Sequence, residues 1–125
     1  MKVLFVCVGN QGRSVMAERL FRAAAPGDEA RSAGSSPGDR VHPGVLEALD
    51  EVGIDASDHV PQKLTPELVD WADVGIATCD DACPFVPGKR YENWQLPDPI
   101  GLPVEQVRPL RDDIDGRVRE LSARS

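Results

Sequence analysis

The 125-residue sequence lacks the features that mark membrane, secreted and nucleic-acid-binding proteins. No apolar run approaches the roughly 20 residues that a membrane span needs, and the first residues show no signal-peptide layout. A surplus of basic residues is also missing, because the net charge is −7. An acidic chain of this kind disfavours a nucleic-acid or anionic-membrane partner. We therefore expect a cytoplasmic protein that binds no nucleic acid and no membrane.

Cysteine is scarce as well, and the count of three is odd: Cys7, Cys79 and Cys83. In a reducing compartment, three cysteines argue against a structural disulfide framework. The content of 41% hydrophobic and 28% charged residues is ordinary for a globular protein. A chain of this length is enough for one domain with a core and too short for two. We expect a single domain over residues 1–125.

Strand-like and helix-like segments alternate along the chain. Short apolar runs predict strands, and apolar residues at steps of three and four predict helices. Thr65 is a predicted helix N-cap, and Gly53 is the predicted end of a helix. The predicted strands are 2–8, 30–36, 73–78 and 90–96, and the predicted helices are 13–25, 43–52, 65–71 and 104–123. This alternation is typical of a small doubly wound α/β domain with a parallel sheet flanked by helices.

The stretch VCVGNQGRS places Cys7 where an apolar strand turns into a helix. Backbone N–H groups of a glycine-containing loop can converge on an anion, and the helix adds the positive end of its dipole. Arg13 supplies a planar cation for two oxygens of a tetrahedral oxyanion. In this field we expect Cys7 to be a thiolate nucleophile, with Ser14 hydrogen-bonding the sulfur and Asn10 tying the loop to itself. The alternative is a packed core cysteine beside a surface arginine. The predicted oxyanion-binding loop comprises Val8, Gly9, Asn10, Gln11, Gly12, Arg13 and Ser14.

The segment FVCVGNQGRSVMAE, residues 5–18, resembles the opening of low-molecular-weight protein tyrosine phosphatases and of the arsenate reductases that share their fold. The resemblance continues through SAGS at 32–35, HPGVLEALDEVGID at 42–55 and the Asp98-Pro99 pair. It covers nearly the whole chain and implies a low-molecular-weight tyrosine phosphatase-like fold.

The resemblance also implies roles for particular residues. Cys7 corresponds to the nucleophile, Arg13 to the oxyanion-binding arginine and Asp98 to the acid. A carboxylic acid at Asp98 could protonate the departing oxygen and later assist as a base, although an aspartate before proline is also common in plain turns. Asn10 and Glu18 match positions at which related reductases use a potassium ion to stiffen the loop, so potassium is a further, weaker candidate.

A second motif, TCDDACP, has no role in phosphate ester hydrolysis. Cys79 follows a predicted strand and is therefore expected at the same carboxyl edge of the sheet as Cys7. Cys83 comes four residues later, and on one helical turn the two Cα atoms would lie about 6 Å apart, within disulfide range. Inert thiols are an alternative. A zinc site is another, but it would need two more ligands, and His42 and His59 are remote in sequence.

The resemblance to three-cysteine arsenate reductases implies a joint purpose for the thiols. Cys7 would attack arsenic, Cys79 would attack Cys7 and release arsenite, and Cys83 would attack Cys79. The resulting disulfide would be reduced by thioredoxin. This chain departs from the better-known three-cysteine pattern in two ways. That pattern separates the last two cysteines by seven positions, whereas Cys79 and Cys83 are four apart, and it often has a cysteine at the position of Gly12. VCVGN resembles a related branch that passes arsenic to mycothiol and uses a glutaredoxin-like mycoredoxin.

These observations predict an arsenate reductase of the kind used in arsenic resistance. It would bind arsenate, work without an organic cofactor, and draw on an external thiol reductant, either thioredoxin or mycothiol with mycoredoxin. The alternative enzyme is a phosphatase acting on phosphotyrosine, disfavoured because Pro99, Ile100 and Gly101 follow the acid where that family usually has aromatic residues. The non-enzymatic alternative is an oxyanion-binding or redox-sensing module.

Overall fold

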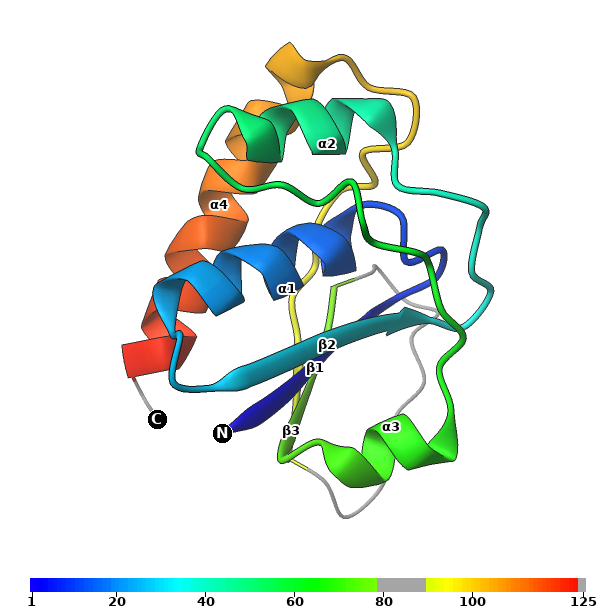
Figure 1. Cartoon of the computed structure of the whole chain (residues 1–125), viewed down its shortest axis with the longest axis vertical. Helices are drawn as coiled ribbons and strands as arrows, with labels where there is room; N and C mark the ends of the chain where they lie inside the picture. The colour runs from blue at the N-terminus through cyan, green and yellow to red at the C-terminus, as the bar shows by residue number, and fades with distance from the viewer. Residues whose placement is uncertain (79–89, 124–125) are drawn as a thin grey trace.

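A parallel sheet forms the middle of the computed structural model, which describes residues 1–78 and 90–123 (Figure 1). Within these residues four strands lie in the order β2-β1-β3-β4, and every neighbouring pair is parallel. The strands are β1 (Lys2–Cys7), β2 (Glu29–Gly34), β3 (Val74–Ala77) and β4 (Arg90–Asn93). This arrangement confirms the predicted small α/β domain with a parallel sheet.

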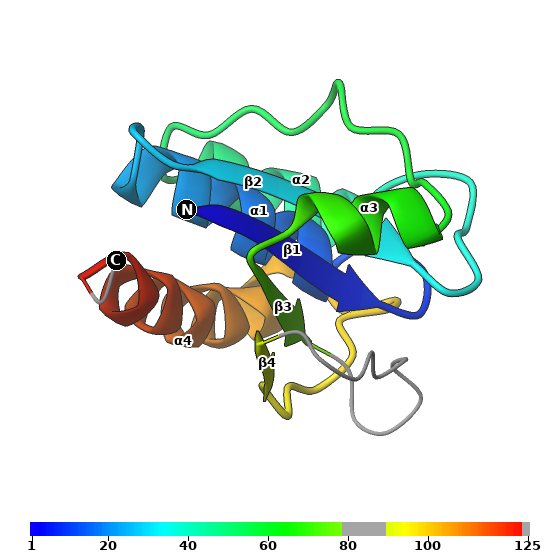
Figure 2. The same ribbon diagram turned by 90° about the horizontal axis from the view of Figure 1, so that it is seen from below.

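The helices are distributed unequally over the two faces of the sheet (Figure 2). They are α1 (Arg13–Ala24), α2 (Pro43–Asp50), α3 (Pro66–Trp71) and α4 (Val104–Ala123). The α1, α2 and α4 helices cover the face to which Val3 and Phe5 point. The α3 helix lies against the other face, where Leu4 and Val6 point. Successive residues of β1 thus serve opposite layers, which explains its unbroken apolar sequence.

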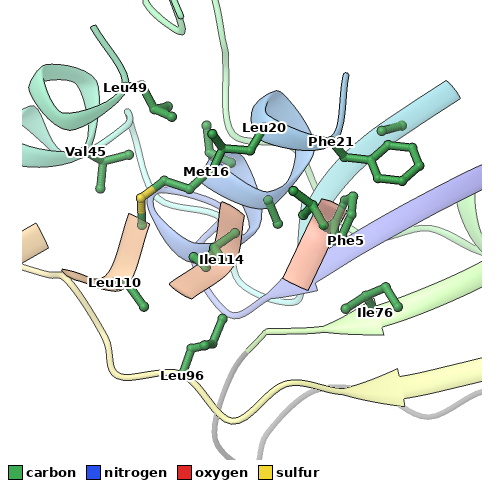
Figure 3. Close-up of a cluster of buried hydrophobic side chains, with 14 of the residues drawn as sticks. Phe5, Met16, Leu20, Phe21, Val45, Leu49, Ile76, Leu96, Leu110 and Ile114 are labelled. Atoms are coloured by element: carbon green, nitrogen blue, oxygen red, sulfur yellow. The ribbon is translucent and has the colours of Figure 1, made fainter. Parts of the chain in front are cut away.

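The main core lies between β1, α1 and α4 (Figure 3). The ring centroid of Phe5 lies 5.9 Å from that of Phe21 on α1 and 5.8 Å from that of Trp94. The α4 helix contributes buried residues at steps of three and four, as its sequence predicts. These residues are Val107, Leu110, Ile114, Val118 and Leu121.

An ion-pair cluster joins the end of α2 to α4. Glu51 accepts hydrogen bonds from Arg108 Nε at 2.9 Å and from Arg111 Nη1 at 2.8 Å. These bonds, led by the one from Arg108, lower the pKa of Glu51 to about 2. The carboxylate therefore stays charged well into the acid range and holds the two helices together there.

The predicted elements all occur, with ends that differ by a few residues. Thr65 caps α3, its Oγ1 accepting a hydrogen bond from the Leu68 N–H at 3.3 Å, and Gly53 takes a left-handed φ of 78° after α2. The last strand ends at Asn93 and not at residue 96. In the described part of the chain, no helix is long and apolar enough for a membrane crossing.

Candidate active site

The loop between β1 and α1 has its carbonyl groups turned outward. Four of these oxygens accept hydrogen bonds from the backbone N–H groups of segment 35–42, at distances of 2.8–3.1 Å. The acceptors are Cys7, Val8, Gly9 and Gln11, and the donors are Ser35, Ser36, Gly38 and His42. A trans peptide directs its N–H opposite to its C=O. The N–H groups of the residues that follow these carbonyls therefore point into the loop, where an anion would lie.

The Cys7 sulfur is contacted by the loop and by the first turn of α1. Its side chain is buried, and the Asn10 N–H donates a hydrogen bond to Sγ at 3.1 Å. The Ser14 hydroxyl oxygen lies 2.9 Å from the same sulfur. Asn10 Nδ2 donates to Ser14 Oγ at 2.8 Å, so the hydroxyl proton is left to point at the sulfur. These contacts confirm the predicted Ser14–sulfur bond and the predicted link within the loop through Asn10.

Asn10 also fastens the loop to a distant part of the chain. Its Oδ1 accepts a hydrogen bond from the Gln62 N–H at 3.0 Å and lies 2.9 Å from His59 Nε2. The Gln62 N–H can only donate, which fixes Oδ1 as the acceptor and requires the His59 tautomer with a proton on Nε2. A continuous chain of hydrogen bonds therefore runs from His59 through Asn10 and Ser14 to the sulfur of Cys7. Asn10 adopts a left-handed φ of 53°, a conformation that asparagine tolerates better than most residues.

Arg13 begins α1, and its guanidinium group is almost fully buried, with 8% of the side chain exposed. Its Nη1 donates to the carbonyl oxygen of Leu96 at 3.0 Å, which holds the planar group beside the loop. Its Nη2 lies 3.9 Å from Asp98 Oδ2. The anchored guanidinium thus places the charge of Arg13 close to the carboxyl of Asp98, the two residues to which the family resemblance assigns roles.

Asp98 is held at the mouth of the site by its own turn. Its Oδ1 accepts a hydrogen bond from the Ile100 N–H at 3.0 Å, and 52% of its side chain is exposed. An open pocket of about 200 Å³ joins the acid to the loop. It is lined by Cys7, Val8, Gly9, Gln11, Gly12, Arg13, Ser36, His42, Asp98 and Ile100. This volume is smaller than the roughly 300–1,000 Å³ of drug-sized ligand sites and suits a small oxyanion.

Close packing keeps the loop in its shape. A Cβ on Gly34, the last residue of β2, would lie 2.5 Å from the carbonyl oxygen of Val8. A Cβ on Gly12 would lie 2.6 Å from Pro99 Cγ. Two glycines therefore allow β2 and the Asp98-Pro99 turn to approach the loop from different sides.

Glu18 is buried beside Ser32 and two arginines. Ser32 Oγ donates to its Oε1 at 2.8 Å, while Arg19 Nε and Arg22 Nη2 lie 3.0 and 3.4 Å from its Oε2. Asn10 Oδ1 already accepts two hydrogen bonds, whereas Glu18 Oε2 is buried and, among the described residues, accepts no hydrogen bond beyond its ionic contacts with the two arginines. Among the described residues, no group of three or more His, Cys, Asp or Glu could hold a metal ion. Potassium stays a prediction.

The two histidines lie near the loop and line different pockets. Burial lowers the pKa of the His59 imidazole, with the charges of Glu18 and Asp58 acting against that shift. His42 is at the mouth, where burial lowers its pKa and the charge of Asp98 opposes the change. Both imidazoles are therefore neutral at pH 7.

The residues within the loop were predictable from the sequence, whereas the distant residues that hydrogen-bond to the loop or to Arg13 were not. His59, Gln62 and the carbonyl of Leu96 lie in segments without periodicity, and no local pattern indicates their contacts. His42 stands inside a segment that resembles the family, but nothing in its spacing pointed to the pocket. Cys79 and Cys83 lie outside the described residues.

The chain is similar over nearly its whole length to proteins of one family. The family described as low molecular weight phosphotyrosine protein phosphatase matches residues 2–124. The glutaredoxin arsenate reductase of Synechocystis sp. is 34% identical, and the alignment covers 98% of this chain and 97% of the relative.

Two solved structures show the same likeness in three dimensions. The thioredoxin-dependent arsenate reductase of Corynebacterium glutamicum is 41% identical with a TM-score of 0.78, covering 98% of this chain and 59% of that one. The low molecular weight protein tyrosine phosphatase of T. tengcongensis is 30% identical with a TM-score of 0.88, covering 100% and 99%. Reductases and a phosphatase thus share this backbone.

Proposed function

Since the chain belongs to the low molecular weight phosphotyrosine protein phosphatase family and is an enzyme of the arsenate reductase type, we propose that it reduces arsenate to arsenite with Cys7 as nucleophile. Arsenate has the charge and shape of phosphate, so one cradle suits both. The finer steps below, including the parts of Cys79 and Cys83, belong to this proposal.

The observation that carries the proposal is the direction of the loop carbonyls. Each oxygen that is bonded outward to segment 35–42 turns the next N–H to the inner side of the loop, and that of Asn10 reaches the sulfur of Cys7. Preorganised donors of this kind stabilise charge that develops in a transition state without reorganising during the reaction. Arg13 adds a fixed cation beside them, and Asp98 adds a carboxyl at the mouth.

In the first step, the Cys7 thiolate attacks arsenic and forms a sulfur–arsenic bond. One arsenic–oxygen bond breaks, and the departing oxygen takes the proton of Asp98 and leaves as water. The inward N–H groups and Arg13 hold the remaining oxygens. Ser14, whose proton points at the sulfur, stabilises the thiolate before attack.

In the second step, the thiolate of Cys79 attacks the sulfur of Cys7. A disulfide forms between them, and the sulfur–arsenic bond breaks with its electron pair on arsenic, which leaves as arsenite with arsenic reduced from the +5 to the +3 state (the two-electron change of one disulfide). Cys83 then attacks Cys79 and releases Cys7 as a thiolate. An external dithiol reduces the Cys79–Cys83 disulfide and completes the cycle.

The reductant is proposed as a thioredoxin. The similarity to the Corynebacterium glutamicum thioredoxin-dependent enzyme favours it, and a cysteine pair in the chain gives a dithiol reductant its substrate. A mycothiol and mycoredoxin system is the competing reductant, because a small thiol could take the place of Cys79 in attacking Cys7.

The test is arsenite production with the reductant systems supplied separately. Wild-type protein should turn over repeatedly with thioredoxin, thioredoxin reductase and NADPH, and Cys7→Ser should make no arsenite because a serine hydroxyl does not ionise there. Turnover with mycothiol and mycoredoxin alone would reassign the reductant. Absence of arsenite with every thiol, together with hydrolysis of an aryl phosphate, would replace the proposal with a phosphatase.

The relay has its own prediction. Cys83→Ser should release arsenite once and stop as a Cys7–Cys79 disulfide, visible by mass spectrometry as a loss of roughly 2 Da. Cys79→Ser should stop earlier. Both variants keep Cys7, Arg13 and Asp98, so a residual hydrolysis of a small aryl phosphate serves as the control for an intact site. Full thioredoxin-coupled turnover by the double serine variant would exclude the relay.

A further inference from the structure

His42 lines the pocket of Cys7, Arg13 and Asp98, and no step of the proposed reaction uses it. The residue stands immediately before α2, and its N–H donates to the Gln11 carbonyl at 3.0 Å. Its Cδ2 would lie 3.5 Å from a Cβ on Gly12, which sets the ring beside the final part of the loop. Backbone contacts thus fix the imidazole at the rim.

The ring is equipped to bind a small ligand. Among the described residues, no hydrogen bond engages a ring nitrogen of His42, although the residue is partly buried. Its carbonyl oxygen, by contrast, is fully used and accepts from the Val45 and Leu46 N–H groups at 3.0 and 3.1 Å. A neutral imidazole offers one donor and one acceptor. Within the part of the chain that the structure describes, the ring nitrogens of this imidazole therefore have no hydrogen-bond partner.

The position of the ring matters because of the direction of attack. In displacement at a tetrahedral oxyanion, the attacking and leaving atoms lie roughly in line with the central atom. Because Cys7 is buried and Asp98 is half exposed in the same pocket, the leaving oxygen is directed toward the open side of the pocket, which Asp98 and His42 also line. In arsenate this oxygen carries at most a proton, whereas in an aryl phosphate it carries a ring. The mouth is thus where the two substrates differ.

We propose that His42 is a specificity-determining residue that hydrogen-bonds the outward oxygen of an unesterified tetrahedral oxyanion. The inference rests on the proposed function and adds to it the group that recognises the free oxyanion. Asp98 acts on the same oxygen by supplying a proton, and His42 holds that oxygen in place. With an aryl phosphate, the imidazole occupies space near the ring and finds no free hydroxyl to bind.

Proton NMR of the imidazoles tests the contact directly, because the chain has only two histidines. Inorganic phosphate is the probe, and calorimetry establishes its saturation. A bound dianion favours the charged imidazole, so the pKa of His42 should rise, whereas the pKa of His59, which lines a different pocket, should change less. Arg13 and Asp98, the charged residues that line the pocket with His42, stay constant in the comparison. An unchanged His42 pKa at saturation, or no phosphate binding, would overturn the proposal.

Two substitutions separate hydrogen bonding from packing. His42→Phe keeps a ring and loses both nitrogens, while His42→Asn loses the ring and keeps an amide donor. His42→Phe should raise the ratio of the arsenate KM to the aryl phosphate KM roughly tenfold, because the variant loses one hydrogen bond to a charged group. His42→Asn should restore part of that ratio. If His42→Phe behaves as wild type and His42→Asn does not, the ring serves packing and the proposal is wrong.

The two levels of inference fail in different ways. If the protein does not reduce arsenate, arsenite is absent for wild type with every thiol, yet phosphate still shifts the His42 resonance. If His42 does not contact the oxyanion, wild type makes arsenite normally and the resonance stays in place.

Discussion

At the scale of single residues, Asn10 shows how much of this site depends on one side chain. It donates through its backbone to Cys7, donates through Nδ2 to Ser14, and accepts at Oδ1 from His59 and Gln62. A short polar side chain that accepts a left-handed backbone is required for all of these contacts at once.

We expect Asn10→Ala to reduce kcat for arsenate reduction about 10- to 100-fold, because it removes the side-chain bonds that orient Ser14 toward the sulfur. Gln62→Ala is the matched control, since Asn10 contacts only the backbone N–H of residue 62. Steady-state kinetics of both variants measure the difference. Equal losses in both would mean that the loop responds to the general packing of this region.

Asp98→Asn should slow the first chemical step by the ~10²–10⁴-fold that general acids typically contribute. The amide keeps the size of the side chain and loses the transferable proton. Single-turnover formation of the arsenic adduct gives the rate, and iodoacetamide labelling of Cys7 shows whether the thiolate survives. A normal rate would assign the proton to solvent or to another group.

The residue contacts that could be predicted are those made within a few positions of Cys7. Spacing and residue type were enough to pair Ser14 with the sulfur, because both lie on one strand–loop–helix unit. The His59 contact spans 49 positions and the Arg13 contact with Leu96 spans 83. Only the folded chain brings such loops together, and no short-range pattern encodes them.

At the scale of elements, the small last residue of β2 allows that strand to pack closely against the loop between β1 and α1. Gly34 pairs with Cys7 in the sheet, and a Cβ there would meet the Val8 carbonyl oxygen at 2.5 Å. A backbone atom on that side cannot yield as a flexible side chain would, so the loop itself would have to move.

Gly34→Ala should therefore lower activity roughly tenfold or more and cost about 1–3 kcal/mol of stability, as overpacking typically does. Gly116→Ala is the control, because its Cβ would meet nothing within 4 Å and α4 should gain about 0.5–1 kcal/mol. Urea unfolding and arsenite production provide the two readouts. An active and stable Gly34→Ala protein would show that the loop tolerates displacement.

The ends of an element were predictable where its apolar residues recur regularly. They were less predictable where tertiary contacts determine the point at which the element ends. The α4 helix has the predicted bounds because its apolar residues recur regularly over twenty positions. The last strand was predicted to reach residue 96 and ends at Asn93. There the chain leaves the sheet, and the Leu96 carbonyl binds Arg13. Arg13 is 83 positions away, so a local pattern of strand-forming residues cannot indicate this contact.

At the scale of the whole molecule, stability should respond to acid in two stages. Both histidines have pKa values below their usual 6.5, because burial disfavours the cation. The unfolded chain then binds protons at a higher pH than the folded chain, so the free energy of unfolding falls as the pH drops below about 6.5. Glu51, with its pKa lowered to about 2, contributes stability that is present above 4.5 and lost between 4.5 and 2.

Urea unfolding at a series of pH values measures both stages. His59→Gln should reduce the loss of unfolding free energy below about pH 6.5 and leave the loss between pH 4.5 and 2 unchanged. Glu51→Gln should have the opposite effect. A first stage that persists unchanged in variants of both histidines would assign it to other groups.

The strand order has a consequence for folding during translation. Cys7, the proposed nucleophile, lies on β1, which is synthesised before both strands that flank it, β2 and β3, and β3 begins only at Val74. Parallel neighbours must wait for a crossover, and such distant pairings form slowly. During translation Cys7 is therefore made early and enclosed late. A nascent chain that stops before β3 should expose the Cys7 thiol to oxidants until the later strands have been synthesised.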